Sequence, residues 1–97
     1  MHIFETIDKT GRNIRLTKKQ FSHIMKRHPM MINYLEEIQQ TLKNPLKITS
    51  YNLDLDVWYY YQYLKSKPGV YKYLLVIVKY LNGEGSVVSS FFDKKIK

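Results

Sequence analysis

The stretch YKYLLVIVKYLNGEGSVVSSFF, residues 71–92, decides the fold of this chain. Its first half, 71–81, is the most continuously apolar run in the sequence, as in a strand that is covered on both faces. The segment NGEG, 82–85, has the turn residues of a tight hairpin. The segment SVVSSFF, 86–92, is therefore predicted to return as the antiparallel partner, so that the strand over 71–81 lies at the centre of a sheet.

Further strands are predicted on both sides of this hairpin in the sequence. VWYYYQYL, 57–64, is dense in β-forming residues and is followed by the turn KSKPG, and KITSY, 47–51, is a shorter candidate. At the N-terminus, HIFETI and RNIRL flank the turn segment DKTG and predict a hairpin. On the last strand, strict alternation would place Val87, Ser89 and Phe91 on one face and Val88, Ser90 and Phe92 on the other.

Two amphipathic helices are predicted between the N-terminal hairpin and the later strands. Thr17 and Gln20 have the spacing of a capping box, which predicts that the first helix begins there. Pro29 disfavours helical geometry at His28, so the helix is expected to end at that residue. A second apolar periodicity runs from Met31 to Leu42 and stops at Asn44-Pro45. We therefore predict one α+β domain, residues 1–97, with an N-terminal hairpin and two helices packed on a four-stranded antiparallel sheet.

The charge balance predicts an acidic partner. Sixteen lysines and arginines against eight acidic residues give a formal net charge of +8. Such a charge attracts nucleic acid, an acidic protein or an anionic membrane, although a merely soluble basic surface has the same composition. Cysteine is absent, which excludes disulfides and thiolate metal sites, and no metal or cofactor is predicted. With neither a signal peptide nor a long apolar segment, we expect a cytoplasmic protein without a membrane contact.

The predicted first helix holds the residues most suited to phosphate chemistry. His23 and Arg27 are four positions apart and share a polar flank with Lys19, whereas His28 points toward the core or its edge. An imidazole can transfer a proton near neutral pH, and a guanidinium can hold phosphate oxygens. The alternative is that His23 is an ordinary exposed helix residue and His28 a satisfied, half-buried one.

The strands add candidate binding residues. Tyr59 and Tyr61 share one face with Tyr63 and could stack bases, or they could simply build a small core. Ser89 could donate a hydrogen bond to a phosphate oxygen or fill a crowded position. Neither a glycine-rich phosphate loop nor an acidic cluster for Mg²⁺ is present, so phosphodiester chemistry here would be metal-free. That favours RNA, whose 2′-OH supplies the nucleophile.

Taken together, GRNIRLTKKQFSHIMKRHPM (11–30), the NP that ends the second helix, and YKYLLVIVKYLNGEGSVVSSFFDKKIK (71–97) resemble the phage and mobile-element nucleases of the barnase–EndoU–colicin–RelE-like fold. The resemblance covers nearly the whole chain, with Met30 in place of the acidic residue that follows HP in the family. It implies helices on a four-stranded antiparallel sheet and a metal-independent ribonuclease, often a toxin or effector with an acidic antitoxin or immunity protein. Carried over by position, it places family functional residues at His23, Arg27, His28, Ser89 and Lys95.

We therefore predict an RNA endonuclease that forms a 2′,3′-cyclic phosphate, with His23 as one proton-transfer group and His28 or a strand tyrosine as the other. The residues expected to bind substrate are Lys19, Tyr59, Tyr61 and Lys72. The alternatives are a non-catalytic basic module that binds nucleic acid or an acidic protein, and a phage structural protein. Convergence of His23, Arg27 and Ser89 on one cleft would favour the enzyme.

Overall fold

Six strands and two α-helices follow one another in the computed structural model, which describes residues 2–96. In chain order the elements are β1 (His2–Ile7), β2 (Asn13–Thr17), α1 (Lys18–Arg27), the 3₁₀ helix η1 (Pro29–Tyr34), α2 (Leu35–Lys43), β3 (Lys47–Tyr51), β4 (Asp54–Tyr63), β5 (Tyr73–Leu81) and β6 (Glu84–Asp93). The α+β class is as predicted. The second helix differs, because its first part is the 3₁₀ turn that follows Pro29 and only the later part is α-helical.

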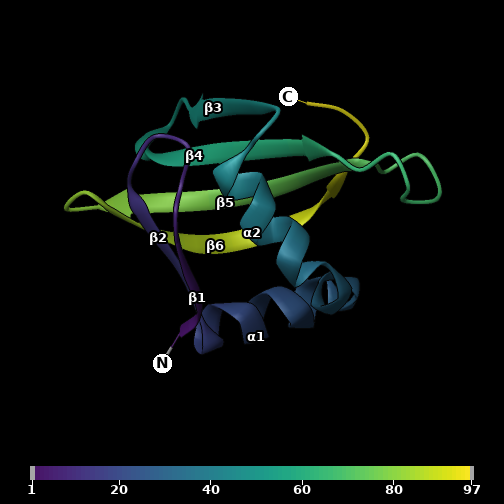
Figure 1. Cartoon of the computed structure of the whole chain (residues 1–97), viewed down its shortest axis with the longest axis horizontal. Helices are drawn as coiled ribbons and strands as arrows, with labels where there is room; N and C mark the ends of the chain where they lie inside the picture. The colour runs from purple at the N-terminus through teal and green to yellow at the C-terminus, as the bar shows by residue number, and fades with distance from the viewer. Residues whose placement is uncertain (1, 97) are drawn as a thin grey trace.

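The sheet has six strands and is mixed, so the prediction of a four-stranded antiparallel sheet is wrong. The strand order is β1-β2-β6-β5-β4-β3, and every neighbouring pair is antiparallel except β2 with β6, which is parallel. The N-terminal hairpin therefore extends the sheet instead of lying apart from it. Figure 1 shows β2 beside β6, with β5 in the interior of the sheet as its apolar sequence predicts.

Gly85 permits the parallel joint between the hairpin and the rest of the sheet. It is paired with Ile14 of β2 on one side and with Tyr80 of β5 on the other. A Cβ at Gly85 would lie 2.8 Å from a ring carbon of Tyr80, 2.9 Å from Val78 and 3.0 Å from Ile14. Side chains of β2 and β5 therefore close over a position that has room only for hydrogen.

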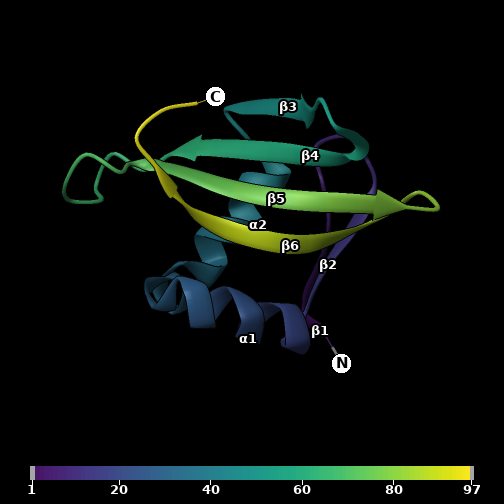
Figure 2. The ribbon, with the colours of Figure 1, turned by 180° about the vertical axis from the view of Figure 1, so that it is seen from behind.

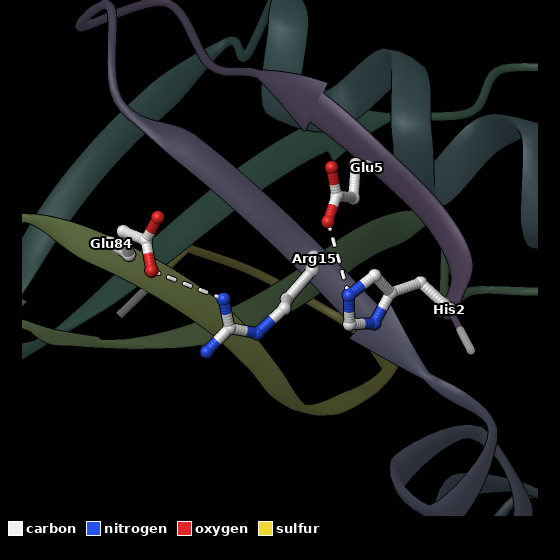
Figure 3. A network of polar contacts seen from close by, with 4 residues as sticks. All are labelled: His2, Glu5, Arg15 and Glu84. Atoms are coloured by element: carbon white, nitrogen blue, oxygen red, sulfur yellow. Dashed lines mark hydrogen bonds and ion pairs between the residues drawn. The ribbon is translucent and has the colours of Figure 1, made fainter.

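A surface ion pair bridges the same joint. Arg15 of β2 contacts Glu84 at the start of β6 with an N–O distance of 3.2 Å, and His2 lies 3.0 Å from Glu5 on β1 (Figure 3). Both pairs are largely exposed, so each contributes at most about 1 kcal/mol. The joint therefore depends mainly on the parallel pairing of Ile14 with Gly85 and of Arg15 with Ser86, and little on these charges.

A β-bulge in β6 changes which face its residues occupy. Ile77 pairs with Ser89 but Val78 pairs with Val87, so Val88 is an extra residue in the ladder. Ser89 consequently lies on the face opposite Val87, which is buried in the core. The predicted grouping of Val87 with Ser89 and Phe91 is therefore wrong for Val87, because strict alternation does not hold across the bulge.

The helices cover one face of the sheet and leave the other without helical cover. Figure 1 places α2 in front of the central strands, and the reverse view in Figure 2 shows β3 to β6 without a helix over them. Phe21 and Ile24 of α1 and Ile38 and Leu42 of α2 are buried against the sheet. On the covered face they meet a buried row from β5, consisting of Leu74, Val76, Val78 and Tyr80.

A buried carboxylate fastens the β1–β2 turn to the sheet. Asp8 is 4% exposed and accepts hydrogen bonds from the hydroxyls of Tyr60 and Tyr80, the latter at 2.9 Å. It also accepts from the backbone N–H groups of Thr10, at 3.0 Å, and Arg12, at 2.8 Å. The Arg12 guanidinium lies over the Tyr80 ring, 3.5 Å from its centroid. The turn is thereby joined to β4 and β5, the strands that carry the two tyrosines.

These contacts change the acid–base behaviour of the whole cluster. Burial raises the pKa of Asp8, but the hydrogen bonds from Tyr60, Thr10, Arg12 and Tyr80 outweigh burial and leave the pKa below its usual value. Burial, together with the bond to Asp8, raises the pKa of Tyr60 to about 12. Burial and the contact with Tyr60 also raise the pKa of Tyr80.

Replacement of Gly85 by alanine is expected to lower the free energy of unfolding by about 1–3 kcal/mol, because the added methyl group overpacks the joint. The control is Ser86→Ala, which changes the next, half-exposed residue. It should lower the free energy of unfolding by no more than about 0.5 kcal/mol. Denaturant unfolding followed by the fluorescence of Trp58 measures both variants. Equal stability of Gly85→Ala and wild type would show that the joint has spare room.

Loss of the Asp8 carboxylate is expected to cost about 3 kcal/mol, because Asp8→Ala leaves two buried hydroxyls without their acceptor. Tyr60→Phe, which keeps the carboxylate and the aromatic ring, should cost about 1 kcal/mol. Because the pKa of Asp8 is lowered on folding, its contribution is complete above the unfolded pKa near 4 and is lost as the pH falls through the folded pKa. The free energy of unfolding, measured between pH 3 and 7, should therefore differ less between wild type and Asp8→Ala as the solution becomes more acidic. A difference that stays constant with pH would contradict this account.

Candidate functional site

His28 stands where the chain leaves α1. The Thr17 hydroxyl caps the start of α1 by accepting a hydrogen bond from the Gln20 N–H at 3.1 Å, as its position in the sequence predicts. At the other end, the His28 N–H still donates to the Ile24 carbonyl at 2.8 Å, but its φ and ψ of −138° and 74° are no longer helical. Pro29 imposes this departure, because its ring disfavours helical geometry at the preceding residue.

The departure from the helix brings the His28 ring to the end of β6. Its centroid lies 5.2 Å from that of Phe91, with an angle of 26° between the two planes. His28 is half-buried: it is neither enclosed in the core nor on the polar flank of α1. One side of the imidazole is therefore held by an aromatic ring while the residue stays accessible.

His28 and Phe91 form part of the wall of a small cavity. Its volume is about 180 Å³, and its other lining residues are Met30, Met31, Lys67, Tyr71 and Phe92. Three separate parts of the chain meet here, namely the start of η1, the end of β6 and the loop between β4 and β5. The lining combines an imidazole, a phenol and an ammonium group with a mainly apolar surface.

Two lysines border this cavity through aromatic rings. The Lys67 ammonium lies 4.5 Å from the centre of the Phe92 ring, and the Lys94 ammonium lies 5.3 Å from the centre of the Tyr71 ring. Both distances are within the range of cation–π contacts. Positive charge is thus held at the rim beside the imidazole and the phenol, an arrangement that suits an anion with an attached aromatic group.

The loop that carries Lys67 and Tyr71 is held by Lys72. The Lys72 ammonium donates hydrogen bonds to the backbone carbonyls of Lys65, at 3.1 Å, and Lys67. The Leu64 N–H donates to the Lys72 carbonyl at 2.8 Å and closes the base of the loop. Lys72, which the sequence suggested as a substrate-binding residue, is therefore engaged with the loop backbone and positions its neighbours.

His23, Arg27 and Lys19 lie elsewhere. All three are exposed on α1, and each residue of a helix is rotated by about 100° from the previous one, so His23 faces away from the buried Phe21. A shallow hollow of about 360 Å³ on this side is lined by Lys19, Ser22, His23 and Lys26. The body of the helix separates it from the sheet, so His23 and Arg27 do not meet Ser89 in one cleft.

The predicted strand residues lie on the face without helices. Ser89 pairs with Ile77, which pairs in turn with Tyr59, and the next row joins Phe91 to Tyr61 through the residue between them on β5. Ser89 is thus the neighbour of Phe91 on one face of β6. Tyr59 is half-exposed and stacked on Tyr51 with ring centroids 5.8 Å apart, whereas Tyr61 is fully buried. Lys95 is exposed beyond the end of β6.

The sequence did not point to Lys67, Tyr71, Phe91 and Lys94, which belong to the surroundings of this candidate site. The available signal was the interleaving of lysine and aromatic residues in KSKPGVYK, 65–72, and FFDKK, 91–95. The sequence does not reveal that these two segments meet the end of α1. Nor are the shifted pKa values a guide, because they belong to Asp8, Tyr60 and Tyr80, which are buried and hydrogen-bonded to one another.

Within residues 2–96, His, Asp and Glu side chains form no group of three or more that could hold a metal ion. In the same part of the chain, no helix has the length and apolar character needed to cross a membrane.

Comparison with known proteins identifies a family for the chain. Residues 3–97 match the family model described as phage-Barnase-EndoU-ColicinE5/D-RelE like nuclease2, which covers nearly the whole chain. Neither a curated protein nor a solved structure matches.

Proposed function

The chain belongs to the phage-Barnase-EndoU-ColicinE5/D-RelE like nuclease2 family, and from this premise we propose that it is a metal-independent RNA endonuclease whose reacting centre is the cavity beside His28. The observation that carries the proposal is the meeting of an imidazole, a phenol and an ammonium group in one accessible hollow. Proton transfer and charge neutralisation are the two tasks that cleavage of RNA by its own 2′-OH requires.

In this mechanism His28 takes the proton from the 2′-OH, and the freed oxygen attacks the adjacent phosphorus. The bond from phosphorus to the 5′-oxygen breaks, Tyr71 gives its proton to that oxygen, and a 2′,3′-cyclic phosphate remains. Tyr71 is suited to this role because a phenol hydroxyl is a hydrogen-bond donor. Stacking on Phe91 holds the His28 ring in one orientation during the transfer.

The developing negative charge lies between the rim lysines. Lys67 and Lys94 supply two cations close to the aromatic wall. Ser89, two residues before Phe91 and on the same face of β6, supplies a hydroxyl for a phosphate oxygen. Lys95, next to Lys94, adds charge at the same end. The apolar part of the wall fits the flat face of a nucleobase, so an unpaired nucleotide is the proposed occupant.

Replacement of His28 by alanine is expected to lower kcat for RNA cleavage by about 10²–10⁴-fold, the usual contribution of a positioned acid or base. Tyr71→Phe should also lower kcat, because phenylalanine lacks the hydroxyl that donates the proton. His2→Ala serves as the matched control, because His2 is an exposed histidine that does not line the cavity and whose side chain forms an ion pair with Glu5. The assay follows cleavage of a single-stranded RNA in EDTA and identifies the cyclic phosphate among the products.

Wild-type activity in His28→Ala, or a loss in His23→Ala that matches the loss in His28→Ala, would contradict this assignment. Binding that falls steeply with salt, with no product at any pH, would instead favour the rival function of a non-catalytic nucleic-acid-binding module. The observation that favours this second function is the separation of His23 and Arg27 from Ser89.

A toxin role is part of the proposal, since an unrestrained ribonuclease of net charge +8 would need an acidic protein to neutralise it. Induced expression of wild type in bacteria should arrest growth, and expression of His28→Ala at the same protein level should not. Growth arrest by both forms would mean that the effect does not depend on the proposed chemistry.

A further inference from the structure

One flank of α1 carries only basic charge. The cationic flank consists of Lys18, Lys19, His23, Lys26 and Arg27, all exposed, and α1 contains no acidic residue. Among the described residues, the ion pairs join His2 to Glu5, Arg15 to Glu84 and Lys79 to Asp54, so none involves this flank. Its charge is therefore not neutralised within the described part of the chain.

Helix stability does not account for this pattern. Lys26 and Arg27 in the last turn favour α1, because cations complement the negative end of the helix dipole. Lys18 and Lys19 do the opposite, since they stand in the first turn, where the dipole favours acidic residues. α2 follows the usual rule, with Glu36 and Glu37 in its first turn. The two lysines at the start of α1 thus oppose the stability of their own helix.

The composition of the flank favours phosphate over protein as its partner. Its side chains are mainly lysine, with Ser22 between them and no aromatic residue, and protein interfaces are depleted of lysine and built around aromatic or apolar anchors. Lysine is a point charge that binds phosphate without reading bases. The hollow between Lys19, His23 and Lys26 provides a concave place for such a group.

The flank is also well placed for a strand of RNA that enters the proposed site. It runs the length of α1, roughly 15 Å at 1.5 Å per residue, and ends at Arg27, immediately before His28. We propose that the cationic flank binds the sugar–phosphate backbone of single-stranded RNA outside the reacting centre and supplies affinity, not proton transfer. This inference rests on the proposed function for the identity of the substrate.

The test measures binding of a fluorescently labelled 2′-O-methyl oligonucleotide, which lacks a free 2′-OH and cannot be cleaved by the proposed mechanism. Lys19→Gln/Lys26→Gln removes two charges from the flank, and the control Lys9→Gln/Lys43→Gln removes two exposed charges elsewhere. A plot of log K against log salt has a negative slope, and each lost phosphate contact reduces its magnitude by about 0.7 for a single strand. The slope of the flank variant should therefore be smaller in magnitude than that of wild type by about 1.4. The control should keep the wild-type slope.

An equal loss of slope in both double variants would overturn the proposal, because net charge and not the flank would then control binding. A wild-type slope in the flank variant would also overturn it. Circular dichroism of both variants checks that α1 is intact, and with cleavable RNA the flank variant should raise KM more than it lowers kcat.

The two proposals fail separately. If wild type cleaves RNA but the flank variant binds the oligonucleotide as wild type does, the ribonuclease assignment stands and the flank does not. If wild type cleaves no RNA, and the salt dependence of binding is reduced in the flank variant but not in the control, the flank is confirmed as a nucleic-acid-binding surface. The ribonuclease assignment is then wrong.

Discussion

The Asp8 carboxylate is the contact on which the rest of the structure depends. It holds the β1–β2 turn against Tyr60 and Tyr80, and so fixes an N-terminal hairpin to the interior strands of the sheet. Two strands alone would be marginal, because a hairpin of this size buries little by itself. With the hairpin in place β2 reaches β6, and Thr17 at the end of β2 is also the cap of α1. The position of α1 is therefore set by the position of β2.

The same chain of contacts extends to the candidate site. α1 begins at the cap, lies near the free part of β6, and ends where Pro29 turns the backbone away from the helix. His28 is left beside Phe91 because the length of α1 carries it from one end of β6 to the other. A carboxylate buried at the hairpin turn thus determines where an imidazole stands beside the end of β6, although the two groups do not touch.

Much of this local structure is predictable from the sequence, because it depends on neighbours in the chain. The cap at Thr17, the end of α1 before Pro29 and the Asn82-Gly83 turn all follow from residue types, and both turn residues have the positive φ values, 55° and 81°, that such a turn needs. The alternation of Tyr59, Tyr60 and Tyr61 between the two faces of β4 is also observed.

Contacts between segments that are distant in the sequence could not be predicted in this way. The β2–β6 joint links Arg15 to Glu84, which are 69 positions apart in the sequence. No local residue pattern in either strand predicts a parallel partner. The lack of room for a side chain at Gly85 becomes clear only when β2 and β5 are placed on either side of β6. The bulge at Val88 has no turn residue to mark it, and Asp8 resembles any other turn aspartate until two tyrosines from other strands reach it. For the same reason the sequence favoured the pair on the polar flank, His23 and Arg27, over the His28 cavity.

The Asp8 cluster and the candidate cavity differ in how their polar groups are bonded. At the hairpin turn, charge is buried and saturated with hydrogen bonds, so its shifted pKa values report stability and not reactivity. At the cavity, His28, Tyr71 and the rim lysines are partly accessible and are held mainly by contacts between rings or with rings. Such contacts leave the polar atoms of these side chains available to a substrate. The partly accessible polar groups at the cavity are therefore the ones on which the proposed proton transfer depends.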